Sequence, residues 1–264
     1  DLSLSRRDLG FADPRDPEEP GISKNEAKRR LDALVEQCKL TVKEKLLPDL
    51  RQDFTTVLGE SGWSVDVDSD DPQTLNFAYP QSEISTAMKY VRPIIRLEMG
   101  ARSDDWPAVE AEITPYAAED FPSMFTQPKC TVRTLSAERT FWEKATLLHA
   151  QFHRPEAKPS AERHSRHYYD LYCLSRHELG REALKRGDLL ERVVKHKSFF
   201  FASSRANYAT AKPGTLRLVP DEKRLAALGA DYDEMQAMMF GDSPKWNDII
   251  RELKMLEDRI NKLA

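Results

Sequence analysis

Glu98, Lys144 and Asp170 are the residues of this sequence whose types and surroundings most favour chemistry. Carboxylates can hold a divalent cation, and a lysine can meet a phosphate oxygen as a point charge. Each of the three also has a purely structural interpretation, and the sequence leaves both interpretations open. Taken together, the three residues fit metal-assisted phosphoryl chemistry.

Glu98 lies in a predicted strand. Alternation places Ile95, Leu97 and Met99 on one face of this strand, with Arg96 and Glu98 on the other. A carboxylate in a central strand needs a partner or a metal, because burying a lone charge is costly. In an edge strand, Glu98 would instead lie on a solvated face and pair with its neighbour Arg96.

Lys144 falls inside the apolar stripe of a predicted helix over residues 136–152. The stripe contains Phe141, Ala145 and Leu148 at helical spacing. A lysine within it must either extend its ammonium group to solvent or meet an anion. A phosphate oxygen is one such anion, because the ammonium acts as a point charge.

Asp170 follows Arg166 and His167 by four and three residues, so all three can share one helix face. A carboxylate between two cationic side chains can orient a base or hold a substrate hydroxyl. Alternatively, the three form a surface ion pair worth at most ~0.5 kcal/mol. His149 and His153 have a metal-ligand spacing, but no third-ligand pattern accompanies them, which disfavours zinc.

The charge is distributed unevenly along the chain. The net charge of −4 combines −10 over residues 1–128, +9 over residues 129–217 and −3 over the remainder. A basic middle segment in an acidic chain indicates an anionic ligand such as phosphate, nucleotide or RNA. Pairing of these cations with the acidic N-terminal part is the alternative.

The hydrophobic patterns predict a mixed α/β N-terminal half and a helical C-terminal half. A capping box at Ser23 begins one helix, and Pro48 is expected to separate it from a second helix that ends at Leu58. Residues 63–79 read as a hairpin, followed by strands at 91–99 and 111–116. Helices are then expected at 136–152, 163–178, 181–196, 198–209, 221–240 and 244–263.

Composition excludes several classes of protein. At 264 residues, with 40% hydrophobic and 32% charged residues, the chain is neither collagen-like nor of low complexity. No apolar stretch approaches the length of a membrane span. The three cysteines are widely spaced and show no zinc pattern, so we expect reduced thiols in a cytoplasmic protein without a signal peptide.

Four segments, in order, resemble the AbiEii/AbiGii nucleotidyltransferase toxin family. Residues 1–4 resemble the tail of its Asp-x-Asp-Leu motif, and residues 141–149 resemble its lysine-bearing helix. Residues 166–171 resemble its Tyr-Asp-Leu segment, and residues 231–241, leading to 260–261, resemble its C-terminal helices. The resemblance therefore extends over nearly the whole chain.

This resemblance implies a nucleotidyltransferase-like mixed sheet, bound Mg²⁺ and a nucleoside triphosphate substrate. Members act as the toxin of toxin–antitoxin or phage-defence pairs, and some modify tRNA. By position, Asp1 matches the second metal-binding Asp and Glu98 plausibly matches the third carboxylate. The resemblance also assigns catalytic roles to Lys144 and Asp170. We expect Lys144, Arg166 and His167 to contact nucleotide phosphate.

One departure from the family pattern affects these expectations. The family's Gly-Gly-Thr/Ser turn and first Asp would precede Asp1, so the chain as it stands is expected to be catalytically incompetent.

A cognate antitoxin is a possible partner. The expected domains are a truncated α/β core over 1–128 and a helical domain over 129–264 that completes the active-site cleft. The alternative is a degenerate RNA-binding module, or a partner that binds an antitoxin through residues 221–264.

Overall fold

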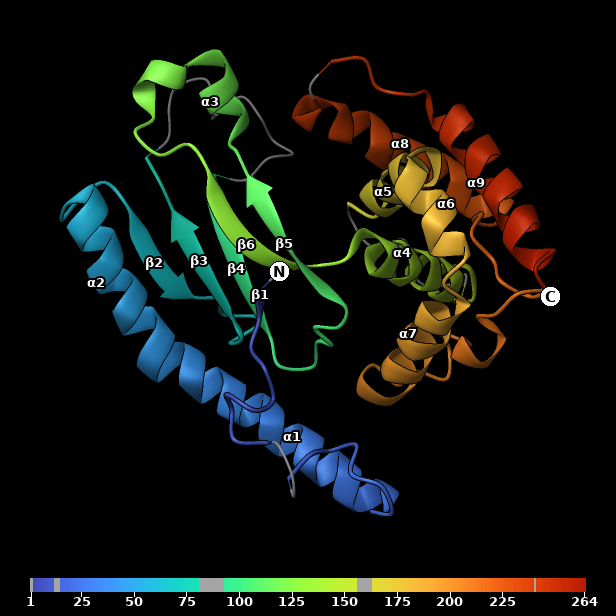
Figure 1. Ribbon diagram of the computed structural model, residues 1–264, viewed down its shortest axis with the longest axis horizontal. Helices are drawn as coiled ribbons and strands as arrows, with labels where there is room; N and C mark the ends of the chain where they lie inside the picture. The colour runs from blue at the N-terminus through green and yellow to red at the C-terminus, as the bar shows by residue number, and fades with distance from the viewer. Residues whose placement is uncertain (1, 12–14, 81–92, 156–162, 240) are drawn as a thin grey trace. The chain divides into compact units, whose positions relative to one another are not determined.

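The computed structural model describes residues 2–11, 15–80, 93–155, 163–239 and 241–264. The chain forms two compact units, Asp1–Asp104 and Asp105–Ala264. The sequence-based division after residue 128 concerned functional domains and stays a prediction. The expected fold class is confirmed, because the N-terminal part holds a mixed sheet and the C-terminal part is mainly helical (Figure 1).

The first helix of this unit is long, and the capping box predicted where it begins. Helix α1 (Lys24–Thr41) starts after Ser23, whose hydroxyl accepts a hydrogen bond from the backbone N–H of Glu26. Leu34 and Cys38 are fully buried on its inner face. The predicted capping and apolar spacing therefore form as expected.

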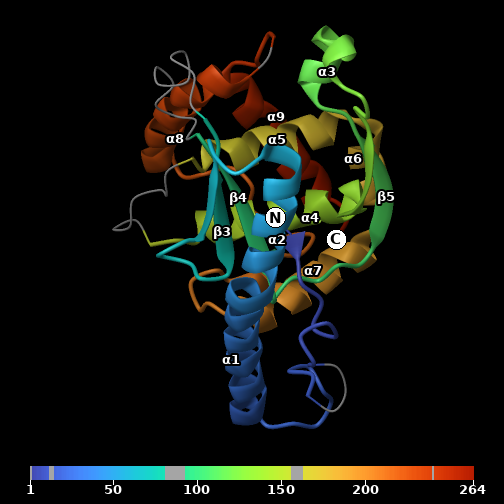
Figure 2. The same cartoon turned by 90° about the vertical axis from the view of Figure 1, so that its left-hand side faces the viewer.

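The predicted break at Pro48 is wrong. Helix α2 (Leu47–Leu58) has Pro48 in its first turn and follows α1 through a π-helical turn, Val42–Leu46. A proline lacks an N–H and crowds the preceding turn. The π-helical turn has wider hydrogen-bond spacing, which accommodates Pro48, and the chain continues as one rod (Figures 1 and 2).

The sheet of the first unit has the order β1-β4-β3-β2. Strand β1 pairs with β4 in parallel, and the other two pairings are antiparallel, so the predicted hairpin at 63–79 is confirmed. One sheet face packs against α1 in a core that includes Leu34, Leu75 and Met99. The strands are β1 (Leu2–Ser3), β2 (Ser64–Val67), β3 (Thr74–Ala78) and β4 (Ile94–Gly100).

The second unit opens with an antiparallel hairpin, β5 (Ala108–Ile113) and β6 (Cys130–Leu135). A short helix, α3 (Tyr116–Asp120), and a 3₁₀ turn, Pro122–Met124, lie between the two strands. The strand predicted at 111–116 is wrong at both ends. Pro115 is the N-cap of α3, so the chain leaves the extended conformation before residue 116.

Helix α4 is central to the second unit, because it packs against α5, α6 and α7. Helix α5 also contacts α8 and α9. Phe141, Trp142 and Leu148 of α4 are almost completely buried. The helices are α4 (Ala137–Phe152), α5 (Ser165–Arg176), α6 (Glu178–Leu184), α7 (Gly187–Phe200), α8 (Glu222–Met235) and α9 (Trp246–Asn261), with 3₁₀ turns at Tyr208–Thr210 and Gln236–Met238.

The helices predicted at 181–196 and 198–209 are wrong. A non-helical residue, Arg186 (φ −104°, ψ 59°), separates α6 from α7. Helix α7 ends at Phe200, and the next regular element is the 3₁₀ turn at Tyr208–Thr210. Buried Ala183, Leu190 and Val193 keep a helical spacing of seven and three residues across the Arg186 turn, so the apolar pattern did not reveal it.

Candidate active site

Glu98 lies on the sheet face of the first unit that is opposite the α1 core. In the register of β3 and β4, Leu75 pairs with Leu97, while Thr74 pairs with Glu98. Leu97 and Met99 belong to the core, so the predicted alternation along β4 is confirmed. Glu98 therefore projects from a central strand, and the edge-strand interpretation is wrong.

The Glu98 carboxylate has one loosely held partner among the described residues. Its Oε1 lies 3.6 Å from Nη1 of Arg96, and the Glu98 side chain is 43% exposed. Arg96 also lies 3.7 Å from Asp68. The neighbour pair expected in the structural interpretation is thus present, but its length and exposure leave the Glu98 oxygens accessible to a ligand.

Asp1 lies outside the described residues. Its covalent neighbour Leu2 pairs in parallel with Met99, the residue that follows Glu98. Strand β1 and strand β4 are therefore hydrogen-bonded neighbours at the start of the chain. The role predicted for Asp1 in metal binding stays a prediction.

Lys144 is positioned by the stable N-terminal turn and apolar stripe of α4. The hydroxyl of Ser136 accepts from the backbone N–H of Arg139 at 3.2 Å and caps the helix. Phe141, Ala145 and Leu148 are buried as the stripe predicts. The Lys144 side chain is 23% exposed, because it lies at the margin of this stripe and faces α5.

Three predicted site residues meet within the second unit. Lys144 Nζ donates to Oδ2 of Asp170 at 2.7 Å and lies 3.1 Å from Nδ1 of His167. His167 and Asp170 are one turn apart on α5, as the spacing predicted. Arg166, the fourth predicted residue of the second unit, is exposed on the same helix. Lys144 thus meets an anion rather than extending freely into solvent.

His167 is held in its neutral form. Burial lowers its pKa to about 3, and the nearby charges of Lys144 and Arg166 act in the same direction. The ammonium of Lys144 has only donors, so the unprotonated Nδ1 is the acceptor and the ring proton resides on Nε2. At neutral pH the cluster therefore contains one cation, one anion and a neutral imidazole.

A family comparison identifies the chain. The family model described as "Nucleotidyl transferase AbiEii toxin, Type IV TA system" matches residues 2–252. The chain belongs to the AbiEii family. The resemblance found in the sequence is thereby confirmed, and the protein is a nucleotidyltransferase toxin of a toxin–antitoxin system. No curated protein and no solved structure shows significant similarity to it.

The AbiEii match covers both units and includes Glu98, Lys144 and Asp170. The fold is consistent with a nucleotidyltransferase. No described helix is long and apolar enough to cross a membrane. Within the described residues, no group of three or more metal-ligating side chains is assembled, and the predicted ligand Asp1 is not among those residues.

A partly buried charged network, which the sequence did not predict, lies beside Lys144 in this AbiEii protein. Glu143 accepts from the Arg139 guanidinium at 2.7 Å and lies 2.8 Å from Nζ of Lys197 on α7. Lys197 also donates to the Glu143 carbonyl and to the Thr146 hydroxyl, at 2.8 and 2.9 Å. One amine therefore holds both ends of the helical turn that carries Lys144.

The electrostatics of this network favour the ionised form of Glu143. Burial alone would raise the pKa of Glu143, but Lys197 and Arg139 outweigh it and hold that pKa below its ordinary value. A signal for the network was present in the sequence. Lys197 lies between Val193 and Phe200, which are buried on the inner face of α7, just as Lys144 lies within an apolar stripe.

The histidine pair on α4 has a structural role. His149 is fully buried, its Nε2 lies 3.1 Å from the Asn207 carbonyl, and its Nδ1 accepts from the backbone N–H of Arg217. Burial lowers the pKa of His149 to about 4. Both ring nitrogens are used by the protein, which agrees with the sequence argument against zinc at His149 and His153.

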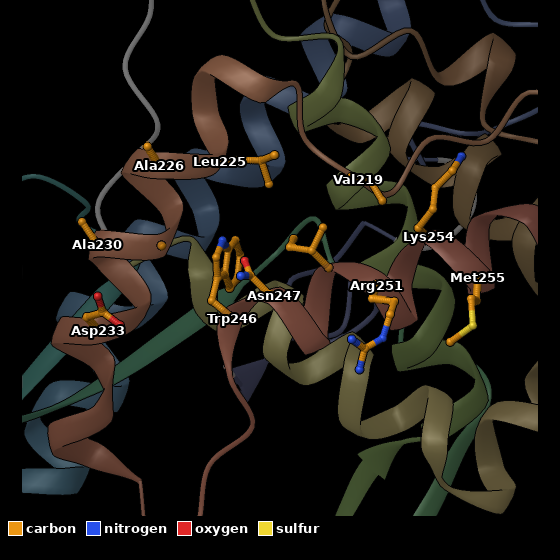
Figure 3. Close-up of a pocket in the computed structure, with 12 residues that line it drawn as sticks. Val219, Leu225, Ala226, Ala230, Asp233, Trp246, Asn247, Arg251, Lys254 and Met255 are labelled. Carbon is orange, nitrogen blue, oxygen red and sulfur yellow. The ribbon is translucent and has the colours of Figure 1, made fainter.

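A groove lies between α8 and α9 (Figure 3). It encloses about 860 Å³, and Leu225, Trp246 and Ile250 are among its apolar lining residues. It shares no residue with the Lys144 cluster. The groove falls mostly within residues 221–264, where an antitoxin contact was predicted, and that contact stays a prediction.

Proposed function

We propose that this AbiEii protein transfers a nucleotide from a nucleoside triphosphate to a hydroxyl of RNA, with tRNA as the favoured acceptor, in a Mg²⁺-dependent reaction. The single observation that supports this best is the 2.7 Å contact between Lys144 and Asp170. These residues are 26 positions apart, and the sequence predicts an anion contact for Lys144 and a hydroxyl-binding role for Asp170. A hydroxyl of a protein is the alternative acceptor.

Glu98, with Asp1, is proposed to hold the metal. A carboxylate oxygen is the ligand type that Mg²⁺ prefers. Glu98 is partly exposed, and its ion pair with Arg96 among the described residues is loose. The chain neighbour of Asp1 pairs with the chain neighbour of Glu98. Bound Mg²⁺ would supply Lewis-acid stabilisation of phosphate oxygens.

The reaction exchanges the α–β phosphoanhydride bond of the nucleoside triphosphate for a phosphodiester bond to the acceptor oxygen. The acceptor oxygen attacks the α-phosphorus, the bond to the bridging oxygen of the β-phosphate breaks, and pyrophosphate leaves with the electron pair. Lys144 offsets charge that develops on the leaving group. Asp170 holds the Lys144 ammonium, and its carboxylate is half-exposed, so we assign it to bind the attacking hydroxyl. We assign Arg166, which is exposed on α5, to the phosphate side of this cluster.

The charge distribution supports an RNA acceptor. Residues 129–217 carry a net charge of +9, and they include α4, α5 and α7. A segment with this excess of positive charge favours binding of polyanions such as RNA, through electrostatic contacts that added salt weakens. A catalytically degenerate RNA-binding module would share this feature, so transfer itself must be measured.

The test expresses the protein, as its gene encodes it, from a regulated promoter. We expect growth arrest by the wild-type protein and loss of arrest with Lys144→Met and Glu98→Gln. Glu112→Gln is the matched control, because Glu112 is an exposed strand carboxylate whose ion-pair partner, Lys129, is not a predicted site residue. Undiminished arrest by the Lys144 and Glu98 variants, at equal protein levels, would refute the proposal.

A further inference from the structure

His167 has a contact that differs from the one expected of a phosphate-binding cation. Its side chain is 14% exposed, and Nδ1 lies 3.1 Å from the Lys144 ammonium. A group that binds phosphate through charge would carry a proton on both ring nitrogens. Here the nitrogen that faces Lys144 must accept, because an ammonium group offers donors only.

The surroundings of His167 disfavour a second positive charge. Lys144 on α4, His164 and Arg166 on α5, and Lys197 on α7 all act against its protonation. Asp170 is the opposing anion, but its Oδ2 is 3.9 Å from His167 Nδ1 and only 2.7 Å from Lys144 Nζ. The Asp170 carboxylate therefore pairs with Lys144 more closely than with His167.

We propose that His167 is a positioning residue, whose Nδ1 accepts a hydrogen bond from Lys144 and fixes the ammonium group in the direction that nucleotide transfer requires. This inference rests on the proposed role of Lys144. It assigns His167 a neutral acceptor role in place of a cationic contact with phosphate. Two acceptors from α5, one neutral and one charged, then determine where the Lys144 side chain ends.

The geometry has a clear energetic reason. A lysine side chain has four rotatable bonds, and an ammonium held by one acceptor can still swing around it. A second acceptor one helical turn away removes this freedom before substrate binds. Pre-organisation of this kind improves the rate, because small displacements of a charged group from its working position are costly.

Two substitutions of His167 separate the alternatives. His167→Asn keeps a neutral acceptor near the position of Nδ1, whereas His167→Arg supplies a cation. We expect His167→Asn to retain growth arrest and to transfer nucleotide at a rate within about threefold of wild type. The transfer rate of His167→Arg should fall by about tenfold to 100-fold. The opposite order would overturn the proposal.

A spectroscopic measurement tests the contact without relying on activity. In protein labelled with ¹⁵N-histidine, long-range ¹H–¹⁵N spectra report the tautomer and protonation of each ring, and His167→Asn assigns the signal. We expect an unprotonated Nδ1 and a protonated Nε2 from pH 5 to pH 8. Lys144→Met should raise the pKa of His167, because it removes a neighbouring cation. Titration of wild-type His167 near pH 6.5 would refute the assignment.

The two proposals can fail separately. If Lys144→Met leaves nucleotide transfer intact while the His167 signal responds to that substitution, the proposed function of Lys144 fails and the His167–Lys144 contact stands. If Lys144→Met abolishes transfer but leaves the His167 signal unchanged, the function stands and the positioning role is refuted.

Discussion

The two charged regions of this AbiEii protein are built in opposite ways. Glu98 projects from the face of a sheet and is 43% exposed. Among the described residues its ion-pair partner is Arg96, whose Nη1 lies 3.6 Å from Glu98 Oε1. Lys144 lies where three helices pack, bonds to Asp170 at 2.7 Å and adjoins the partly buried Glu143–Lys197 pair. The carboxylate is thus left accessible to a ligand, whereas the lysine is held in place by its own chain.

This difference indicates which properties each region should control. Substitution at the sheet face should change ligand binding with little effect on folding, because few protein contacts are lost. Substitution in the helical network should affect folding as well, since buried charges lose their partners. Variants that change ligand binding without changing folding stability, or the reverse, test this difference between the two regions.

The largest effect on stability is expected for Lys197→Met. It removes the amine that neutralises Glu143 and bonds to the α4 backbone, so we expect the free energy of unfolding to fall by about 3 kcal/mol. Lys195→Met on the same helix is the control, because Lys195 is exposed, and it should change stability by less than about 0.5 kcal/mol. Urea unfolding followed by circular dichroism gives both values. Equal effects would mean that the buried pair contributes nothing.

Acidification should weaken the helical unit through its neutral histidines. The pKa values of His149 and His167 are lowered to about 4 and about 3, whereas the unfolded chain binds these protons near pH 6.5. The contribution of these two histidines to stability is therefore fully present above pH 6.5 and is lost as the pH falls toward their folded-state pKa values. Between pH 7 and pH 5 we expect the free energy of unfolding to fall by up to about 2 kcal/mol for each of these histidines.

Urea unfolding at both pH values tests this expectation. His167→Asn should remove part of the acid sensitivity, because one of the histidines with a lowered pKa is lost. His177→Asn is the control, since that histidine is exposed in the turn before α6. Identical pH dependence of the wild-type protein and the His167 variant would contradict the assignment of a neutral, buried His167.

A smaller effect on stability is expected for Asp170→Asn. The Lys144–Asp170 pair is partly exposed, with side chains 23% and 40% accessible, so solvent screens much of its energy. We expect a loss of less than about 1 kcal/mol in urea unfolding, together with loss of growth arrest. A loss as large as that of Lys197→Met would place Asp170 in the structural network instead.

The smallest effect is expected for Arg96→Met. Its contact with Glu98 is long and half-exposed, so the free energy of unfolding should change by less than about 0.5 kcal/mol. Removing a cation beside Glu98 should also strengthen Mg²⁺ binding, measured as a lower Mg²⁺ concentration for half-maximal transfer. A higher Mg²⁺ requirement would contradict the metal-binding role of Glu98.

The same contrast explains what could be predicted from the sequence. The face that carries Glu98 follows from period-two alternation between Leu97 and Met99, a local property of one strand. The helix that carries Lys144 follows from its cap and apolar stripe. The contact between Lys144 and Asp170 was not predicted, because the sequence offered Arg166 and His167 as the neighbours of Asp170 and a phosphate oxygen as the anion for Lys144.

Other features depend on packing between distant segments. The pairing of Glu143 with Lys197 joins α4 to α7 and is not encoded in the pattern of either helix alone. The turn at Arg186 interrupts an apolar spacing that continues across it, so no local signal marked it. The π-helical turn before Pro48 likewise reflects the need to keep α1 and α2 as one rod.

The most direct test of the central claim is nucleotide transfer by the purified protein, as its gene encodes it. Nucleoside triphosphates labelled at the α-phosphate are incubated with tRNA and Mg²⁺, and the RNA is analysed for label. We predict labelled tRNA that disappears with EDTA and falls by at least about 100-fold with Glu98→Gln or Lys144→Met, but not with Glu112→Gln. Label transfer at the wild-type rate by the Glu98 and Lys144 variants would contradict the account.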